Sequence, residues 1–269
     1  MQKQITSLDG IKINYEVHGA DNADRCLVFL HGLGGCLRAF DHMVENLSDV
    51  NYRLISVDLR AHGRSQRPAH HSQHALRYFI DDLLLILQAE QVKQPTLVGH
   101  CFGGIVAMSA AINYPQLIGG LILINVSYKV PHLSKLIYQA FPLKGILAFM
   151  LKFLPHLYFK NYPDYAKFEQ SGDFNPKRIG SDVLHTSFKS YVYMCREIIQ
   201  FDFSKKLKDI SCPTLVIHGA QDRVFSAQVA RSLARKIKGA KLRIIKRGNH
   251  LTVLNNKEEL VTIIKQYLA

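Results

Sequence analysis

The sequence predicts an α/β fold in which a mostly parallel, doubly wound sheet carries helices on both faces. Short apolar runs recur along the chain, helix-like runs alternate with them, and this alternation is typical of such sheets. A single long segment, residues 127–204, departs from the alternation. With 269 residues, of which 48% are hydrophobic, the chain is long enough for one large domain or for a domain with an insert.

Seven segments have the composition of strands. The first, residues 11–17, alternates apolar and polar side chains, which predicts an antiparallel strand. The others are short and almost wholly apolar, as expected of parallel strands covered on both faces. They are residues 26–32, 52–59, 96–100, 120–125, 214–219 and 242–247. Helical spacing of apolar residues predicts helices over 75–91, 102–114, 227–237 and 257–268.

Residues 127–204 contain no clear strand pattern and are rich in Leu, Phe, Tyr and Lys. We expect them to form a helical cap over one edge of the sheet, so that residues 1–126 and 205–269 make up the core. Their apolar side chains suit ordinary packing or the lining of a pocket for an acyl chain or a hydrophobic ring. Lysines beside the apolar runs leave a membrane-surface role open as well.

Composition argues against several other classes of protein. The five cysteines are scattered without a CxxC pair, which predicts no disulfide framework and no zinc site. No apolar stretch approaches about 18 residues, and the first ten residues lack the apolar core of a secretory signal. We therefore expect a cytoplasmic protein without a transmembrane segment, a metal or a cofactor. The histidine-rich stretch 70–74 has no recognisable ligand spacing and is predicted to be a solvated loop.

Basic residues are concentrated near the C-terminus of a chain whose net charge is +13. Residues 223–247 contain nine Lys and Arg residues and no acidic residue. A solvated helix face and strand edge would explain this composition. A docking surface for an acidic carrier protein, coenzyme A or a lipid surface would explain it equally. Nucleic acid is not expected, because no aromatic interleaving or recognition motif accompanies the charge.

The stretch GHCFG, residues 99–103, places Cys101 between a predicted strand and a predicted helix. Gly99 and Gly103 flank it with the spacing of a G-x-nucleophile-x-G turn, where bulky neighbours would clash. The N–H groups that open the helix favour negative charge at this point, which would raise the thiolate fraction of a cysteine. A small buried filler is the alternative interpretation, but such a residue needs no glycine on both sides.

These features resemble the α/β-hydrolase family over nearly the whole chain. The family orders its residues as nucleophile, acid and histidine along an eight-stranded, mostly parallel sheet, and the matching residues here are Cys101, Asp222 and His250. Asp222 lies in HGAQDRVF, which resembles the acid turn, and His250 lies in RGNHL, which resembles the histidine loop. The resemblance implies that His250 exchanges protons with the thiol and that Asp222 orients the imidazole. Taken alone, Asp222 could be a helix N-cap and His250 a structural residue.

The stretch FLHGLGG, residues 29–35, resembles the family loop that supplies an oxyanion donor. By position, the two donors would be the main-chain N–H groups of Leu33 and Phe102. We place His31, Gly32 and Asn125 beside the substrate pocket, with the His31 ring bonded to nearby main chain and Asn125 as a possible partner that orients His250. The stretch DLRAHGRS, residues 58–65, resembles the family loop that follows the fourth strand. Its Asp58 is a second candidate for the acid, but the resemblance implies that it is a structural turn residue.

In having a cysteine at this turn, the chain resembles the dienelactone hydrolases. Its G-x-C-x-G-G pattern resembles that of the polyhydroxyalkanoate synthases. The chain length and compact insert are more similar to small esterases, enol-lactonases and carrier-protein esterases, where serine is usual. We therefore expect a hydrolase of carboxylic ester, thioester or lactone bonds that forms an acyl-enzyme on a small-molecule acyl substrate with a hydrophobic portion. An acyltransferase with the same triad, an esterase of carrier-bound acyl groups and a non-catalytic ligand receptor remain alternatives.

Overall fold

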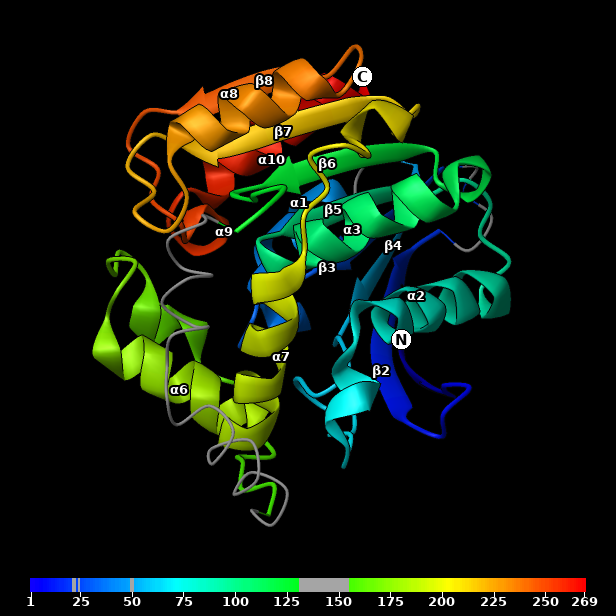
Figure 1. The fold of residues 1–269 in the computed structure, drawn as a ribbon. Coiled ribbons are helices and arrows are strands. Elements are labelled where there is room, and N and C mark those ends of the chain that lie inside the picture. Colours follow the sequence, from blue (N-terminus) through cyan, green and yellow to red (C-terminus); the bar gives the residue numbers. More distant parts are fainter. Residues whose placement is uncertain (21–22, 24, 49–50, 131–154) are drawn as a thin grey trace.

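The computed structural model describes residues 1–20, 23, 25–48, 51–130 and 155–269, and an eight-stranded sheet passes through the molecule (Figure 1). The strands are β1 (Gln2–Thr6), β2 (Lys12–Gly19), β3 (Arg25–Leu30), β4 (Tyr52–Val57), β5 (Thr96–His100), β6 (Gly120–Ile124), β7 (Thr214–Gly219) and β8 (Lys241–Ile245). Their order is β1-β2-β4-β3-β5-β6-β7-β8. β2 is antiparallel to both of its neighbours, and the strands from β4 to β8 are parallel, so the predicted fold class is confirmed.

Every predicted strand is present, with ends that shift by a few residues. β1 was not predicted, because its sequence QKQIT carries a single large aliphatic residue and lies at the sheet edge. An edge strand is held by main-chain hydrogen bonds to one neighbour, here from Gln2↔Glu16 to Thr6↔Lys12, so it needs no apolar run.

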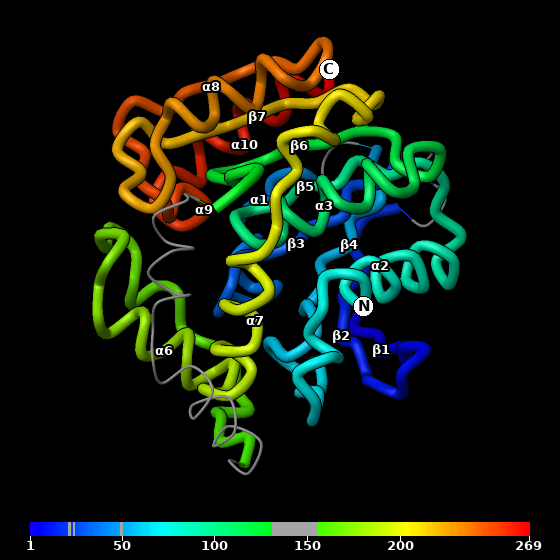
Figure 2. The backbone as a smooth tube through the Cα atoms, viewed as in Figure 1, coloured from blue at the N-terminus to red at the C-terminus, as the bar shows by residue number. Residues whose placement is uncertain are grey.

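Helices cover both faces of the sheet, as Figures 1 and 2 show. α2 (Leu76–Ala89), α3 (Phe102–Asn113) and α8 (Ala227–Lys236) contribute buried side chains to the core on one face. α1 (Asp41–Leu47), α9 (Thr252–Asn255) and α10 (Lys257–Leu268) contribute to the core on the other. The sequence predicted neither α1 nor α9, since each has two turns or fewer and is too short to show a helical period.

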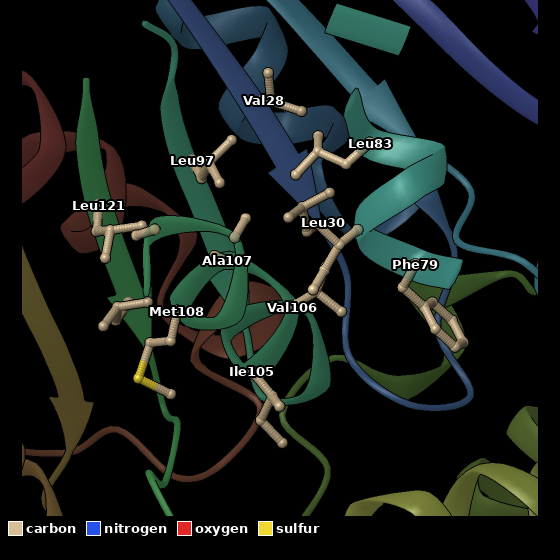
Figure 3. Close-up of a cluster of buried hydrophobic side chains, with 14 of the residues drawn as sticks. Val28, Leu30, Phe79, Leu83, Leu97, Ile105, Val106, Ala107, Met108 and Leu121 are labelled. Carbon is tan, nitrogen blue, oxygen red and sulfur yellow. The ribbon is translucent and has the colours of Figure 1, made fainter. Parts of the chain in front are cut away.

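Alternating strand residues divide between the two cores. On β5, Leu97 belongs to the core beneath α2 and α3, whereas Val98 belongs to the core beneath α1 and α10. Figure 3 shows Leu30, Leu83 and Val106 directed into the space shared by β3, α2 and α3. Burial of one such aliphatic side chain stabilises the fold by about 1.5–3 kcal/mol. These two layers hold the carboxyl ends of the parallel strands, and the loops on them, in fixed positions.

The segment between β6 and β7 carries α6 (Pro176–Thr186) and α7 (Phe188–Gln200) in its described part. In Figures 1 and 2 both helices lie at the side of the molecule opposite α8 and β8. Residues 131–154 of the predicted cap lie outside the described residues. The division of the chain into core and cap at residues 127 and 204 stays a prediction.

The prediction of a solvated loop at residues 70–74 is wrong. His71–His74 forms a 3₁₀ helix that packs against α7, and the His74 side chain is fully buried. Its Nε2 lies 3.1 Å from the Ser190 hydroxyl oxygen. The histidines therefore join the sheet domain to α7. Within the described ranges, no helix combines the length and the apolar character that crossing a membrane would need.

Candidate active site

Cys101 occupies a sharp turn between β5 and α3. Its backbone has φ 48° and ψ −111°, a conformation that is costly for a residue with a Cβ and that occurs at functional turns. The neighbouring main chain passes so closely that a Cβ on Gly99 would lie 2.6 Å from the carbonyl oxygen of Gly103. A Cβ on Gly103 would lie 1.9 Å from the carbonyl oxygen of Leu30. Any residue with a Cβ at position 99 or 103 would therefore clash with the neighbouring main chain.

The structure brings His250 and Asp222 together beside this turn. Nδ1 of His250 lies 2.8 Å from Oδ2 of Asp222, so the ring donates to the carboxylate through Nδ1 and directs Nε2 elsewhere. Both residues are buried, and each lies in the loop that follows a strand, β7 for Asp222 and β8 for His250. Asp222 is not the N-cap of α8, a position that Ser226 occupies. Its Oδ1 instead accepts from the N–H groups of Val224 and Phe225 and orients the carboxylate.

The charges of this group favour an imidazolium. Burial alone would lower the pKa of His250, but the charge and hydrogen bonding of Cys101 and Asp222 outweigh it and raise that pKa to about 10. Burial opposes the ionised form of Asp222 too, yet hydrogen bonds from His250 and Asn125 hold its pKa below the ordinary value. Cys101 and Asp222 thus contact the same ring, and a proton on that ring is stabilised from both sides.

The loop after β3 passes next to Cys101. A Cβ on Gly32 would lie 3.4 Å from the Cβ of Cys101, so the N–H of Leu33 comes from main chain beside the thiol. Phe102 is the first residue of α3, and the first N–H of a helix has no acceptor within that helix. Among the described residues, no main-chain carbonyl accepts from the N–H of Leu33 or Phe102 in a turn or loop. A role of these two N–H groups as oxyanion donors stays a prediction.

Two side chains from other loops hold the loop after β3, which is the predicted oxyanion loop. The N–H of Gly34 donates to Nε2 of His62 over 3.1 Å, and the N–H of Leu37 donates to Oδ1 of Asp58 over 2.9 Å. Asp58 is fully buried and also accepts hydrogen bonds from the side chains of Asn14 and Tyr162. Asp58 therefore acts as the structural residue that the family resemblance implied.

His31 and Asn125 are both fully buried, and a place beside the substrate pocket stays a prediction for them. Nδ1 of His31 lies 2.8 Å from the Gly32 carbonyl oxygen, and its Nε2 accepts from the Leu59 N–H, so the ring is bonded to nearby main chain as expected. Asn125 is also fully buried, and its Nδ2 donates to Oδ2 of Asp222 over 2.8 Å. Asn125 thus orients the carboxylate of Asp222, which in turn contacts His250.

Sequence reasoning missed two residues that hold the His250 loop. Nε2 of His100 lies 2.9 Å from the carbonyl oxygen of His250, and burial lowers the His100 pKa to about 3, so the neutral ring donates this hydrogen bond. Oδ1 of Asp173 accepts from the N–H of His250 over 2.8 Å. The position of His100 beside the motif cysteine was a signal for the first, whereas nothing in the sequence around Asp173 indicated the second.

In the described ranges, no three His, Cys, Asp or Glu side chains are grouped as metal ligands would be. The five cysteines are all free thiols, and Cys101 and Cys195 are the two that are only partly buried. The chemical groups gathered at the turn are a thiol, an imidazole, a carboxylate and two main-chain donors.

Comparisons with known proteins agree with this fold. The family model described as alpha/beta hydrolase fold matches residues 26–257. The chain is 24% identical over 297 residues to a proline iminopeptidase from Saccharolobus solfataricus, covering 96% of this chain and 89% of the relative. A hydrolase from Pseudomonas aeruginosa has a similar structure, with a TM-score of 0.78, 24% identity and coverage of 100% and 98% of the two chains. The enol-lactonase from Burkholderia xenovorans gives a TM-score of 0.76 at 20% identity, with 99% of each chain covered.

An eight-stranded α/β sheet with a strained turn after β5 defines a class of hydrolytic enzymes. Because the family model spans most of the sequence, this chain belongs to the α/β-hydrolase family, and it is an enzyme of that family.

Proposed function

We propose that the protein hydrolyses carboxylic ester, thioester or lactone bonds through an acyl-enzyme on Cys101. The observation that carries the proposal is the hydrogen-bonded group of Asp222 and His250 at the turn that presents Cys101. The enol-lactonase and esterase names among the similar structures support the substrate class. The substrate is a small acyl compound with a hydrophobic portion, which residues 127–204 would cover as a cap.

The first half-reaction transfers the acyl group to sulfur. The thiolate of Cys101 attacks the carbonyl carbon, and the electron pair of the C=O bond moves to oxygen. The N–H groups of Leu33 and Phe102 stabilise this oxyanion, and one such donor is worth about 3 kcal/mol in the transition state. The C=O bond then re-forms and the C–O or C–S bond to the leaving group breaks, while His250 gives its Nε2 proton to the departing oxygen or sulfur. A thioester remains on Cys101.

The second half-reaction returns the enzyme to its starting state. Neutral His250 takes a proton from water, and the resulting hydroxide attacks the thioester carbonyl carbon. The C–S bond breaks, the carboxylic acid leaves, and the thiolate and imidazolium are restored. If an alcohol, amine or thiol replaces this water, the same group performs acyl transfer, and analysis of the released product would distinguish the two reactions.

Intact-mass spectrometry tests the acyl-enzyme. We would expose the protein to activated esters, lactones and acyl thioesters and expect a transient adduct on Cys101, located by peptide mapping. Cys101→Ala should abolish the adduct, and Cys195→Ala is the matched control because Cys195 is the other partly buried thiol. In His250→Ala, any adduct that forms should persist longer. Stable labelling of a different cysteine would contradict the assignment.

The basic segment 223–247 supports a narrower proposal, that the acyl group arrives on an acidic carrier protein or on coenzyme A. All nine of its Lys and Arg side chains are exposed on α8, β8 and their loops, and in the described part of the chain none of them forms an ion pair. Clustered positive charge raises the encounter rate with an anionic partner.

Charge reversal tests this second point. Arg235→Glu combined with Lys236→Glu should raise KM for carrier-bound or coenzyme A substrates and leave KM for small neutral esters unchanged. The control is Lys12→Glu with Lys93→Glu, an equal charge change at exposed residues of other elements. An equal effect of the first pair on small esters would argue against docking.

A further inference from the structure

Asp173 connects the segment between β6 and β7 to the loop of the proposed catalytic histidine. The residue is 6% exposed, and its two carboxylate oxygens have different partners. Oδ1 accepts from the main-chain N–H of His250 over 2.8 Å, and Oδ2 accepts from the main-chain N–H of Arg223, also over 2.8 Å. Because Arg223 follows Asp222 directly, one carboxylate holds both the histidine loop and the acid loop.

Neighbouring residues strengthen the same connection. The carbonyl oxygen of Ser171 accepts from Nδ2 of Asn249 over 2.9 Å and from Nδ2 of Asn255 over 3.0 Å. The N–H of Gln170 donates to Oδ1 of Asn255 over 2.8 Å. Four contacts therefore join residues 170–173 to residues 249–255, and they involve main chain on at least one side each.

Further along the chain, α6 contacts the predicted oxyanion loop. Nη2 of Arg178 donates to the carbonyl oxygen of Asp173 over 2.8 Å, and Arg178 also pairs with Asp182 one turn further along α6. A Cβ on Gly34 would lie 2.6 Å from the Cβ of Asp182, so this part of α6 rests on the oxyanion loop. Residues 173–182 thus contact both loops that border Cys101.

We infer that Asp173 is a positioning residue, which fixes the main chain of His250 so that the imidazole meets Cys101. The inference rests on the proposed function, since it concerns the same histidine. His250 and Cys101 are far apart in the sequence, so non-covalent contacts must place the imidazole beside the thiol. Hydrogen bonds on both sides of the residue, to Asp173 through the N–H and to His100 through the carbonyl oxygen, set its place. Small displacements of a reacting group lower rates steeply.

The test compares Asp173→Ala and Asp173→Asn with Asp164→Ala. Asp164 lies in the same segment but its side chain is exposed, which makes it a matched control. Asn keeps the shape and one acceptor oxygen, but its amide group faces one of the two N–H donors, so it cannot replace both bonds. We expect kcat to fall about tenfold or more in Asp173→Ala and less in Asp173→Asn, with KM within about threefold of the wild type.

A readout without substrate separates this inference from the proposed function. Iodoacetamide alkylation of Cys101, followed by peptide mapping at about pH 6 and about pH 9, reports how well an imidazolium supports the thiolate. The ratio of the low-pH rate to the high-pH rate should fall at least about threefold in Asp173→Ala, and Asp164→Ala should keep the wild-type ratio. A folded Asp173→Ala protein with wild-type ratio and wild-type kcat would overturn the inference.

Failure of the proposed function and failure of the inference about Asp173 would give different results. If the wild type forms no acyl adduct with any substrate, the proposed function fails, while the alkylation ratio still decides whether Asp173 positions His250. If Asp173→Ala does not fold, Asp173→Asn decides by the same ratio. An unchanged ratio in a folded Asp173→Asn protein overturns the inference in that case.

Discussion

Asn125 and Asp222 are separated by 97 positions in the chain, yet Nδ2 of Asn125 donates to Oδ2 of Asp222 over 2.8 Å. The same amide nitrogen donates to the carbonyl oxygen of Asn249, and its Oδ1 accepts from the Thr252 hydroxyl. The side chain at the end of β6 therefore connects the acid loop to the histidine loop, with no exposed surface of its own.

Replacement of Asn125 by Ala should weaken both the fold and the site. Buried partners left without a hydrogen bond destabilise a protein by about 1–3 kcal/mol, measurable by urea unfolding. Asp222 would lose a donor that favours its carboxylate form, so its pKa should rise. The acid limb of kcat/KM should then move to higher pH. Asn113→Ala removes a partly buried intrahelical bond and should leave that limb in place.

Cys101→Ser should lower the pKa of His250 from its value of about 10. A serine hydroxyl carries no negative charge at neutral pH, so the ring keeps Asp222 as a partner but loses the thiolate. NMR titration of the imidazole would follow the change. Asp222→Asn should lower the same pKa by a separate route. An identical titration in wild type and Cys101→Ser would show that no thiolate faces the ring.

The raised pKa of His250 has a definite effect on stability. A group whose pKa is higher in the folded than in the unfolded protein contributes stability that is present below the unfolded value of about 6.5 and is lost as pH rises toward about 10. The contribution of His250 itself to the free energy of unfolding should therefore decline over this interval. In His250→Gln the decline should be smaller, as denaturant unfolding at several pH values would measure.

Acid should destabilise the protein for a different reason. Burial lowers the pKa of seven histidines in the described part of the chain, and the effect is strongest at His31, His62, His74 and His100. Each of these four takes up a proton on unfolding, so each lowers the free energy of unfolding by about 1.4 kcal/mol per pH unit below about pH 6.5. Asp182 opposes this, because burial raises its pKa to about 7 and it binds a proton only when folded.

The expected result is a net uptake of protons on unfolding near pH 5.5, taken from the slope of stability against pH. His74→Gln should lower that uptake by about one proton. A stability that does not change between about pH 7 and about pH 5.5 would contradict the assignment of four buried neutral histidines.

The glycines of the turn give a prediction with an internal control. Gly103→Ala should prevent the strand–turn–helix packing, because its Cβ would lie 1.9 Å from the Leu30 carbonyl oxygen. We expect loss of folded protein or destabilisation above about 3 kcal/mol. Gly180→Ala lies in α6 with nothing within 4 Å of the new Cβ, and should stabilise by up to about 1 kcal/mol. Thermal unfolding of both variants would compare them directly.

The local sequence pattern was sufficient to predict the parallel strands, but it did not predict every helix and strand. Residues 96–100 and 120–125 form central strands that are apolar throughout, and such runs are visible without coordinates. β1 and α1 left no such pattern, since an edge strand alternates exposed positions and a helix of seven residues shows too few turns. The solvated loop predicted at residues 70–74 failed because polarity in sequence does not reveal that α7 packs on it.

The sequence by itself determined the parallel sheet, the tight turn at Cys101 and the order of the three residues that the family resemblance marks. These depend on side-chain period, on the lack of a Cβ at Gly99 and Gly103, and on chain order, all of which are local or linear properties. Only the tertiary structure decided what holds those residues in place. The bonds from His250 to Asp173 and to His100 join positions 77 and 150 apart, and chain folding alone brings such partners within hydrogen-bond distance.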